Sequence, residues 1–329
     1  MKPQRILLIQ LRQLGDILLT TPCIAAIKED NPAHEIIFLC HEMGLRVLGD
    51  NALLSEVWTY KETDSVWTQL QLLRRIRETP FDLVFDFMNN PRSLLFALAA
   101  RSPKKLAFTS SRSWFYTDTV SKVAYQNYIV REKFLLLEQA GFHPQCEDLL
   151  LPLPKQAFAC VETFLHDTPM LQCSSLRVVL SPTHRRPARK WAPDRYVALA
   201  DRLTREWGAT VIWVWGPGEK EEVEALQAQC KETTWLSPPT SFPELAAFLQ
   251  RMHLFVGNSN GISHLAIAMD TPSLQLHGPT SARSWCPLTE RHKALQSPEV
   301  EGRPAPTLDP ISLDLVWDTL TTLRPLASK

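Results

Sequence analysis

A glycine and an aspartate, Gly15-Asp16, follow an apolar run of strand length at residues 6–10. Glycine permits the tight turn that a strand-to-helix connection needs. The carboxylate then lies beyond the carboxyl end of a strand, where ligands bind in α/β proteins. An aspartate at this position is also a common helix cap. Asp16 is therefore predicted either to face a ligand or to cap the next helix, which is expected to run to about residue 28.

A second group of candidate residues lies in a basic segment at residues 181–191, directly after the apolar run at 177–181. Four cations fall within residues 185–190, ahead of a predicted helix that begins near residue 193. Backbone N–H groups at a helix start, together with arginine and lysine side chains, form an anion site suited to a pyrophosphate. A solvated basic loop is the alternative. The residues that would bind the anion are Thr183, His184, Arg189 and Lys190.

Two glycine-containing turns are further candidates. The first contains Ser259, Asn260 and Gly261, and His264 lies one turn into the helix predicted after it. Its small residues let a ligand approach the backbone, although a histidine on an apolar helix face is more often packed in a core. The second turn ends at Glu219 and would place this carboxylate against a nucleoside. Turns of that kind are common, so this signal is the weaker one.

Apolar runs of strand length alternate with helical patterns along the chain, which is typical of βα units around parallel sheets. We predict two similar α/β domains at residues 1–165 and 176–329, with a final helix at 311–323 that packs back on the first domain. Ligands of such sheets bind beyond the strand ends, so the site is expected in the cleft between the domains. Residues 101–128 are expected to include long loops. Strands are predicted at 6–10, 36–40, 57–60, 82–87, 177–181, 210–215, 234–236, 254–256 and 273–276.

The composition is that of an ordinary globular protein. Of the 329 residues, 45% are hydrophobic, and 35 lysines and arginines balance 35 aspartates and glutamates. A net charge of zero gives no general attraction to nucleic acid, so no nucleic-acid partner is predicted. The seven cysteines are scattered without a C-x-x-C pair, which argues against a zinc site and fits a reducing cytoplasm. No apolar stretch approaches the roughly 20 residues that cross a bilayer. We predict a cytoplasmic protein without a metal site.

Taken together and in order, these segments resemble the ADP-heptose:lipopolysaccharide heptosyltransferases, glycosyltransferase family 9. The resemblance covers nearly the whole chain, and its most specific parts are the Gly15-Asp16 turn and residues 188–193, 257–266 and 277–280. It implies a GT-B fold, in which two Rossmann-like domains with parallel sheets face a central cleft. The first domain would bind mainly the acceptor and the second the nucleotide sugar. It also implies inversion at the anomeric carbon without a metal ion or other cofactor.

Residue by residue, the family's catalytic aspartate corresponds to Asp16. By this resemblance Asp16 would accept the proton of the acceptor hydroxyl in a single displacement. The family's phosphate-binding lysine corresponds to Arg189, a cation of different reach and geometry, and Lys190 follows it. Cations would then stabilise the departing diphosphate in place of Mg²⁺.

The remaining donor-binding positions match less evenly. Gly261 and His264 agree with the family pattern, whereas Ser259-Asn260 stand where the family usually carries an acidic residue followed by Ser or Thr. Because that carboxylate is associated with the hydroxyls of the donor sugar, the identity of the sugar is left open. The residues near positions that contact adenosine in the family are Glu219 and Thr240.

The predicted acceptor side is basic and aromatic. Between residues 89 and 125 six cations occur against one acid, Asp118, and the aromatic run 114–116 lies among them. This composition suits a phosphorylated or acidic glycolipid at a membrane surface. A solvated basic face with one buried aromatic cluster is the alternative. The residues expected to bind the acceptor are Arg92 and Arg112.

The sequence therefore predicts an inverting glycosyltransferase that moves a heptose, or a similar sugar, from an ADP-sugar to a lipopolysaccharide inner core or related glycan. It would work in the cytoplasm, with peripheral contact at the inner membrane. One alternative is another GT-B enzyme such as a nucleotide-sugar epimerase, which would need further acid/base carboxylates. The other is a non-catalytic paralogue that binds sugar nucleotides, which Ser259 favours and the intact Gly15-Asp16 turn opposes.

Overall fold

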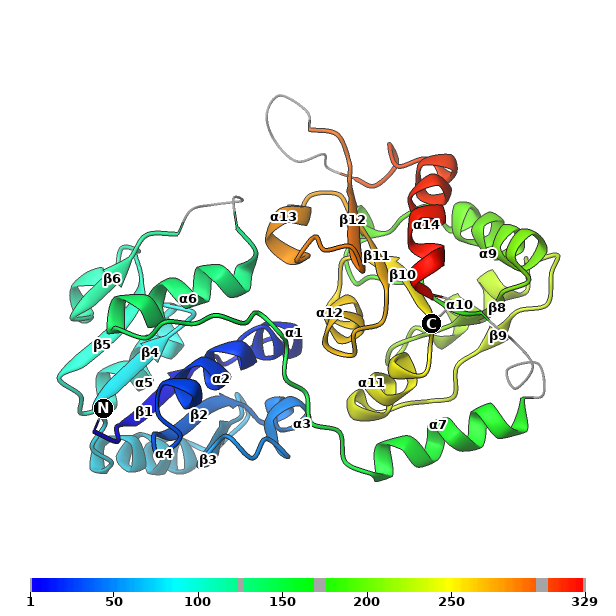
Figure 1. Ribbon diagram of the computed structural model, residues 1–329. Helices are drawn as coiled ribbons and strands as arrows, with labels where there is room; N and C mark the ends of the chain where they lie inside the picture. Colours follow the sequence, from blue (N-terminus) through cyan, green and yellow to red (C-terminus); the bar gives the residue numbers. More distant parts are fainter. Residues whose placement is uncertain (1, 123–126, 169–175, 300–306, 328–329) are drawn as a thin grey trace. The chain divides into compact units, whose positions relative to one another are not determined.

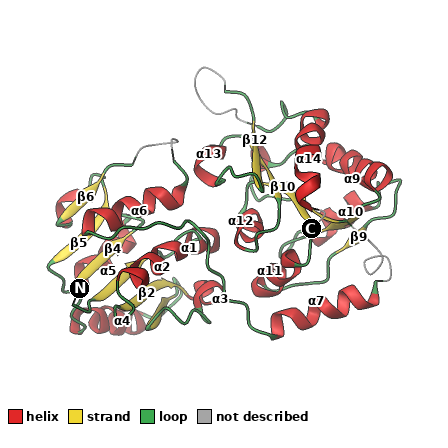
Figure 2. Cartoon of the chain, viewed as in Figure 1, coloured by secondary structure: helices red, strands yellow, loops and turns green. Residues whose placement is uncertain are grey.

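The computed structural model describes residues 2–122, 127–168, 176–299 and 307–327 (Figure 1). The chain divides into two compact units, Met1–Pro152 and Leu153–Lys329. In each unit helices cover both faces of one sheet (Figure 2). The predicted α/β architecture with two parallel sheets is thus confirmed.

The sheet of the first unit has six parallel strands in the order β3-β2-β1-β4-β5-β6. The chain builds outward from β1 to β3 and then returns to place β4 on the other side of β1. The switch point, where the loops after two neighbouring strands diverge, therefore lies between β1 and β4. The strands are β1 (Arg5–Ile9), β2 (Glu35–His41), β3 (Glu56–Tyr60), β4 (Leu83–Asp86), β5 (Lys104–Phe108) and β6 (Asp118–Val120).

The helices of the first unit bury apolar side chains of alternating strand positions. Leu7 and Ile9 of β1 pack in one core cluster with Ile76 of α4 and Phe96 of α5. Ile6 and Leu8 point to the opposite face, since side chains alternate along a strand. Helices α4 and α5 contact each other, and α2 and α6 form a separate pair. The helices are α1 (Leu14–Leu18), α2 (Thr21–Asp30), α3 (Leu45–Leu48), α4 (Val66–Glu78), α5 (Pro91–Ala99) and α6 (Ile129–Ala140), with 3₁₀ turns η1 (Glu42–Gly44) and η2 (Ser113–Phe115).

The sheet of the second unit repeats this topology, in the order β12-β11-β10-β7-β8-β9. Its switch point lies between β7 and β10. The strands are β7 (Arg177–Ser181), β8 (Thr210–Trp213), β9 (Trp235–Leu236), β10 (Leu254–Asn258), β11 (Ser273–His277) and β12 (His292–Gln296). The helices are α7 (Gln156–Asp167), α9 (Pro193–Trp207), α10 (Lys220–Gln227), α11 (Phe242–Gln250), α12 (Gly261–Ala268), α13 (Ala282–Trp285) and α14 (Leu313–Ala327), with the 3₁₀ turn η3 (Pro187–Arg189).

The boundary between the units differs from the predicted end of the first domain at residue 165. Helix α7 belongs to the second unit, because its apolar face packs on α11. Val161 is fully buried, and the rings of Phe164 and Phe248 lie 5.8 Å apart. Of the predicted linker at 166–175, residues 169–175 lie outside the described residues.

The final helix, α14, was predicted to pack back on the first domain. The structure shows it packed on α9, β10 and β11 of the second unit. Trp317 and Leu320 enter the core of that unit, and the Trp317 ring lies 4.9 Å from the ring of Trp207. The apolar face of the helix is thus covered by its own unit.

Two further differences concern local structure. The single helix predicted to run to about residue 28 is two helices, α1 and α2, because Pro22 has no N–H to continue the first and instead occupies the first turn of the second. The segment expected to hold long loops contains β5 and β6, and α6 follows it. No helix among the described residues is long and apolar enough to cross a membrane.

Candidate active site

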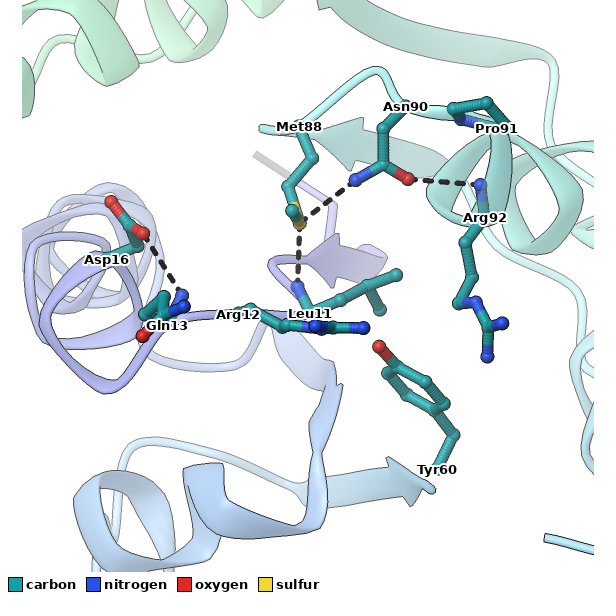
Figure 3. A pocket seen from close by; sticks show the side chains of 9 residues that line it. All are labelled: Leu11, Arg12, Gln13, Asp16, Tyr60, Met88, Asn90, Pro91 and Arg92. Carbon is teal, nitrogen blue, oxygen red and sulfur yellow. Dashed lines mark hydrogen bonds between the residues drawn. The ribbon is translucent and has the colours of Figure 1, made fainter. Parts of the chain in front are cut away.

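Both sheets are parallel, so the loops that carry the candidate residues leave each sheet at one edge. In the first unit, the loops after β1 and β4 flank the switch point and enclose a pocket of about 480 Å³ (Figure 3). Figure 3 shows Asp16 and Arg92 on opposite sides of this pocket. The lining residues are Leu11, Arg12, Gln13, Asp16, Tyr60, Met88, Asn90, Pro91 and Arg92.

Asp16 caps its helix and also lines the pocket. Its Oδ2 accepts a hydrogen bond of 3.0 Å from the backbone N–H of Gln13, which is the N-cap residue of α1. No hydrogen bond from another described residue reaches Oδ1, and the half-buried side chain lines the pocket. One carboxylate oxygen therefore fixes the turn, while the other can accept a proton from a bound ligand.

The opposite wall of the pocket is cationic and aromatic. The guanidinium carbon of Arg92 lies 5.5 Å from the centre of the Tyr60 ring. The Tyr60 hydroxyl is buried and has no hydrogen-bond partner among the described residues. Arg12 is ion-paired with Glu62, and both side chains are about half exposed. The pocket can thus offer two guanidinium groups and a hydroxyl to an anionic, hydroxyl-rich ligand.

A buried carboxyl group holds the loop after β4 in place. Asp86 Oδ1 accepts hydrogen bonds of 2.9 Å from the N–H groups of Met88 and Asn89, and Oδ2 accepts one of 2.6 Å from the Tyr116 hydroxyl. Burial raises the pKa of Asp86, and these hydrogen bonds oppose the rise. Because Met88 and Asn90 line the pocket, Asp86 helps to set its shape.

The two arginines predicted to bind an acceptor separate in the structure. Arg92 lines the pocket, whereas Arg112 does not and instead donates a hydrogen bond of 3.2 Å to the carbonyl of Asn89. Sequence reasoning missed Arg12, Gln13, Tyr60 and Asn90 as pocket residues. Arg12-Gln13 directly precede the Gly-Asp turn, and Asn90 before Pro91 is a helix-start signal, so both signals are present in the sequence.

In the second unit, hydrogen bonds join three of the predicted donor-side loops. The Thr183 hydroxyl donates to Glu219 Oε2 at 2.6 Å, and the N–H of Gly216 donates to the same oxygen at 2.9 Å. Asn260 Nδ2 donates to the carbonyl of Thr183 at 3.3 Å. The loops after β7, β8 and β10 therefore form one continuous surface at the switch point.

Arg189 and Lys190, in the basic loop after β7, have different neighbours. Arg189 lies close enough to His184 and His277 to lower the pKa of both, although burial is the larger cause in each case. Lys190 Nζ donates to both carboxylate oxygens of Glu222 on α10, at 2.6 and 2.8 Å. The positive charge of Arg189 thus acts on both histidines, whereas Lys190 is already paired with Glu222.

Two histidines lie together behind this loop. His264 is 5% exposed, and its ring centre lies 5.9 Å from that of Trp285. Burial lowers the pKa of His277 to about 3, with smaller contributions from His264 and Arg189, so His277 is neutral near pH 7. The sequence placed His277 in a specific motif without giving it a role.

The turn at the start of α12 is largely satisfied within itself. Asn260 Oδ1 accepts hydrogen bonds from the N–H groups of Ile262 at 2.9 Å and Ser263 at 3.3 Å, and it therefore caps the helix. The buried Ser259 donates its N–H to the carbonyl of Leu276 at 3.0 Å. Fewer backbone donors thus face a ligand than the glycine-rich turn suggests.

Thr240 is not part of the hydrogen bonds that connect the other predicted donor-side residues within the described ranges. It is half-buried on the loop after β9, directly before the N-cap residue of α11. Within the described ranges, no hydrogen bond joins it to Thr183, Glu219 or Asn260. In the same ranges no group of three or more His, Cys, Asp or Glu side chains could hold a metal ion.

Two parallel sheets of this strand order, with candidate site loops at both switch points, define the class of GT-B proteins. The sequence profile of glycosyltransferase family 9 (heptosyltransferase) matches residues 69–306. The chain belongs to this family and is a glycosyltransferase.

Individual relatives agree with this assignment. The chain is similar to lipopolysaccharide heptosyltransferase 3 of Escherichia coli K12, with 25% identity over 293 residues, covering 85% of this chain and 84% of that protein. It shares the fold of the glycosyl transferase family 9 protein from Veillonella parvula, with a TM-score of 0.85, 20% identity, and 99% and 98% of the two chains covered. It also shares the fold of E. coli heptosyltransferase WaaC with ADP, with a TM-score of 0.74, 18% identity, and 96% and 99% covered.

The nucleotide-sugar epimerases are more distant. The UDP-GlcNAc 2-epimerase from Neisseria meningitidis aligns with a TM-score of 0.51 and 11% identity, over 98% of this chain and 93% of that one. The epimerase alternative is therefore not favoured.

Proposed function

We propose that this glycosyltransferase moves a heptose, or a closely similar sugar, from an ADP-sugar to the inner core of a lipopolysaccharide-type glycolipid. The observation that carries the proposal is the pocket at the first switch point, where the open oxygen of Asp16 faces a cationic wall. The donor and acceptor classes are supported by a relative that is a lipopolysaccharide heptosyltransferase and by a structural neighbour with ADP.

In the proposed reaction Asp16 is the general base. Its Oδ1 accepts the proton of the acceptor hydroxyl while that oxygen attacks the anomeric carbon of the donor. The bond between the anomeric carbon and the diphosphate oxygen breaks in the same displacement, so the configuration inverts. The hydrogen bond from Gln13 to Oδ2 supports this role, because it holds the carboxylate in one orientation.

The departing diphosphate needs positive charge as it leaves. Arg189 is the strongest candidate, because it lies at the switch point beside His184 and is not paired with a described carboxylate. Lys190 would contribute less while it is bound to Glu222. A fixed cation in a partly dry site stabilises developing charge without reorganisation. The remaining proposed donor contacts are Thr183, Glu219, Thr240, Ser259, Asn260, Gly261 and His264.

The acceptor is proposed to be anionic because the pocket wall opposite Asp16 carries Arg12 and Arg92. Phosphate or carboxylate groups on a core sugar would bind such guanidinium groups in forked pairs. Arg112 lies beside Asn89, at the edge of the same loop, and could extend this contact to a larger glycan.

Peripheral contact with the cytoplasmic face of the inner membrane is part of the proposal. Trp67 is 77% exposed at the start of α4, and Trp114 is 85% exposed in η2, next to Arg112. Exposed tryptophans among cations are typical of proteins that touch an anionic lipid surface. Such a contact would bring the pocket to an acceptor that is anchored in the membrane.

The proposed function is tested by donor selection and by acceptor-dependent release of nucleotide. In a thermal-shift panel of ADP-, UDP-, GDP- and CMP-sugars, ADP-heptose should raise the melting temperature most, since a ligand at 100 times its Kd stabilises by about 2.7 kcal/mol. ADP should then be released only when a core glycolipid is added. Binding of ADP-heptose without any release would instead support the non-catalytic paralogue.

A further inference from the structure

A buried lysine lies beneath the turn that carries Asp16. Lys133, in α6, is 4% exposed, and its Nζ donates a hydrogen bond of 2.9 Å to Gln10 Oε1. The same nitrogen lies 5.0 Å from the centre of the Phe87 ring. Removing an ammonium group from water is strongly unfavourable, so a lysine in this place calls for a functional reason.

Gln10 links Lys133 to the segment that precedes Asp16. It is the residue directly after β1, and its Nε2 donates to the carbonyl oxygen of Arg12. The next residue, Gln13, donates its N–H to Asp16. A connected path of three hydrogen bonds and the Arg12–Gln13 peptide unit therefore runs from the Lys133 ammonium to the carboxylate that lines the pocket.

Among the charged groups near Lys133, Asp16 has the largest effect on its pKa, which it raises, although burial has a larger and opposite effect. The other titratable groups that act on Lys133 are Cys23 of α2, Glu132 of its own helix and Lys122 after β6. Burial raises the pKa of Cys23 to about 12, so its thiol is neutral near pH 7. Burial also raises the pKa of Glu132, and Lys122 contributes repulsion.

We infer that Lys133 is a positioning residue for the catalytic carboxylate. Its ammonium holds the side chain of Gln10 and, through the Arg12 carbonyl, the segment whose Gln13 N–H orients the Asp16 carboxylate. This inference rests on the proposed role of Asp16 as the base. It assigns Lys133 a function through Asp16 and no contact with substrate.

The rate of transfer is expected to depend on the protonation state of Lys133. Burial lowers the pKa of Lys133 to about 8, although Asp16 opposes this fall. The positive charge is thus present near pH 7 and is lost as the pH rises through about 8. Transfer by the wild-type enzyme should therefore decline on the alkaline side of about pH 8.

The test measures kcat/KM for sugar transfer against pH in the wild type and in Lys133→Met. Methionine has a similar length and no charge. The variant should lose the decline near pH 8, because it has no ammonium group to titrate. At neutral pH its kcat should fall by about tenfold, because a catalytic group that is no longer held in its productive position loses rate.

A second variant separates charge from folding. Gln10→Leu with Lys133→Met removes both partners of the buried hydrogen bond, a change that is often nearly neutral for stability. It also removes the hydrogen bond from Gln10 to the Arg12 carbonyl. This double variant should fold like the wild type and still lack the alkaline decline. Arg131→Met is the matched control, since Arg131 lies on the same helix and pairs with Glu147 at the surface. It should keep the wild-type profile.

Two outcomes would overturn the inference. One is a Lys133→Met enzyme with the wild-type rate and an unchanged pH profile. The other is a double variant that recovers full activity together with the wild-type alkaline limb, which would make Lys133 a structural residue only. Both outcomes leave the proposed base untouched if Asp16→Asn is inactive, whereas an active Asp16→Asn would remove the base and this inference together.

Discussion

The two units have the same strand order but use their switch points differently. In the first unit, the loops after β1 and β4 leave a pocket with a carboxylate on one side and arginines on the other. In the second unit, hydrogen bonds among Thr183, Glu219 and Asn260 join the loops into a surface, with Arg189 beside it. The same strand order thus carries a pocket with a carboxylate in one unit and a hydrogen-bonded, basic surface in the other, and the difference lies in the loops.

Both units have the same kind of cap on the helix that follows their fourth strand. Asn90 caps α5 and Asn260 caps α12, and a serine three residues later completes a capping box in both cases. The difference lies in the loop after the first strand, which is short and leads into α1 in one unit and is long and basic in the other. The shared capping box fixes the start of a helix, and the candidate residues lie in or beside the loops that differ.

The largest expected effect comes from Asp16→Asn. Asparagine keeps the shape and can still accept the hydrogen bond of Gln13, but it cannot take the acceptor proton. Transfer should fall by about 10²–10⁴-fold, the range for loss of a general base, while ADP affinity and melting temperature stay near wild type. Full activity in this variant would mean that the carboxylate only caps α1, since asparagine is a nearly equal cap.

Arg189→Ala should have the next largest effect, which is a loss of ADP binding by the second unit. ADP binding, measured by calorimetry, should weaken by about 1.5–3 kcal/mol, as for a lost charged hydrogen bond. Lys190→Ala is the matched comparison, because it removes a neighbouring cation that already pairs with Glu222. It should weaken binding by less than about 1 kcal/mol, the value of an exposed pair. Equal losses in the two variants, or none, would contradict the assignment of Arg189.

Arg92→Ala should act on the first unit alone, and more weakly. The KM for the acceptor should rise by about tenfold, which corresponds to about 1.4 kcal/mol, without a change in ADP affinity. Arg112→Ala is the comparison variant and should have a smaller effect, because its guanidinium is bound to the carbonyl of Asn89 outside the pocket. A larger effect of Arg112 would place the acceptor over η2 instead.

The smallest expected effect concerns acid stability and His277 in the second unit. A histidine whose pKa is lowered on folding takes up protons more readily when unfolded, so its contribution to stability is present at neutral pH and is lost as the pH falls toward about 3. Thermal melts of His277→Gln should therefore depend less steeply on pH below about 6.5 than those of the wild type. His166→Gln, at an exposed histidine of α7, should leave the slope unchanged.

The sequence was informative where local pattern and burial coincide. Buried parallel strands are continuous apolar runs, and β7 was predicted with its observed bounds for this reason. It was uninformative where charged residues lie in regular structure. Strand β5 begins with Lys104-Lys105, and α6 buries Glu132 and Lys133, which tertiary contacts alone can explain.

The candidate site was predictable in part for a similar reason. Gly15-Asp16 and the basic loop are marked by residue type and by their place after a strand. The pocket wall, by contrast, is made where Tyr60 of β3 meets Arg92 of α5, a contact that no spacing in the sequence records. The sequence also could not show that Lys190 is ion-paired while Arg189 is paired with no described carboxylate, because the partner of Lys190, Glu222, lies in a different segment, helix α10.

The packing of α14 has a consequence for how the protein is made. The first unit is contiguous and complete at Pro152, so its core can close while the ribosome is still translating the remainder. The second unit needs Trp317 and Leu320 of α14 to fill its core. Its folding must therefore wait until α14 has been made, and during that interval the basic loop and its neighbours remain available to chaperones and proteases. A premature stop before α14 would release a folded first unit attached to an incomplete second one.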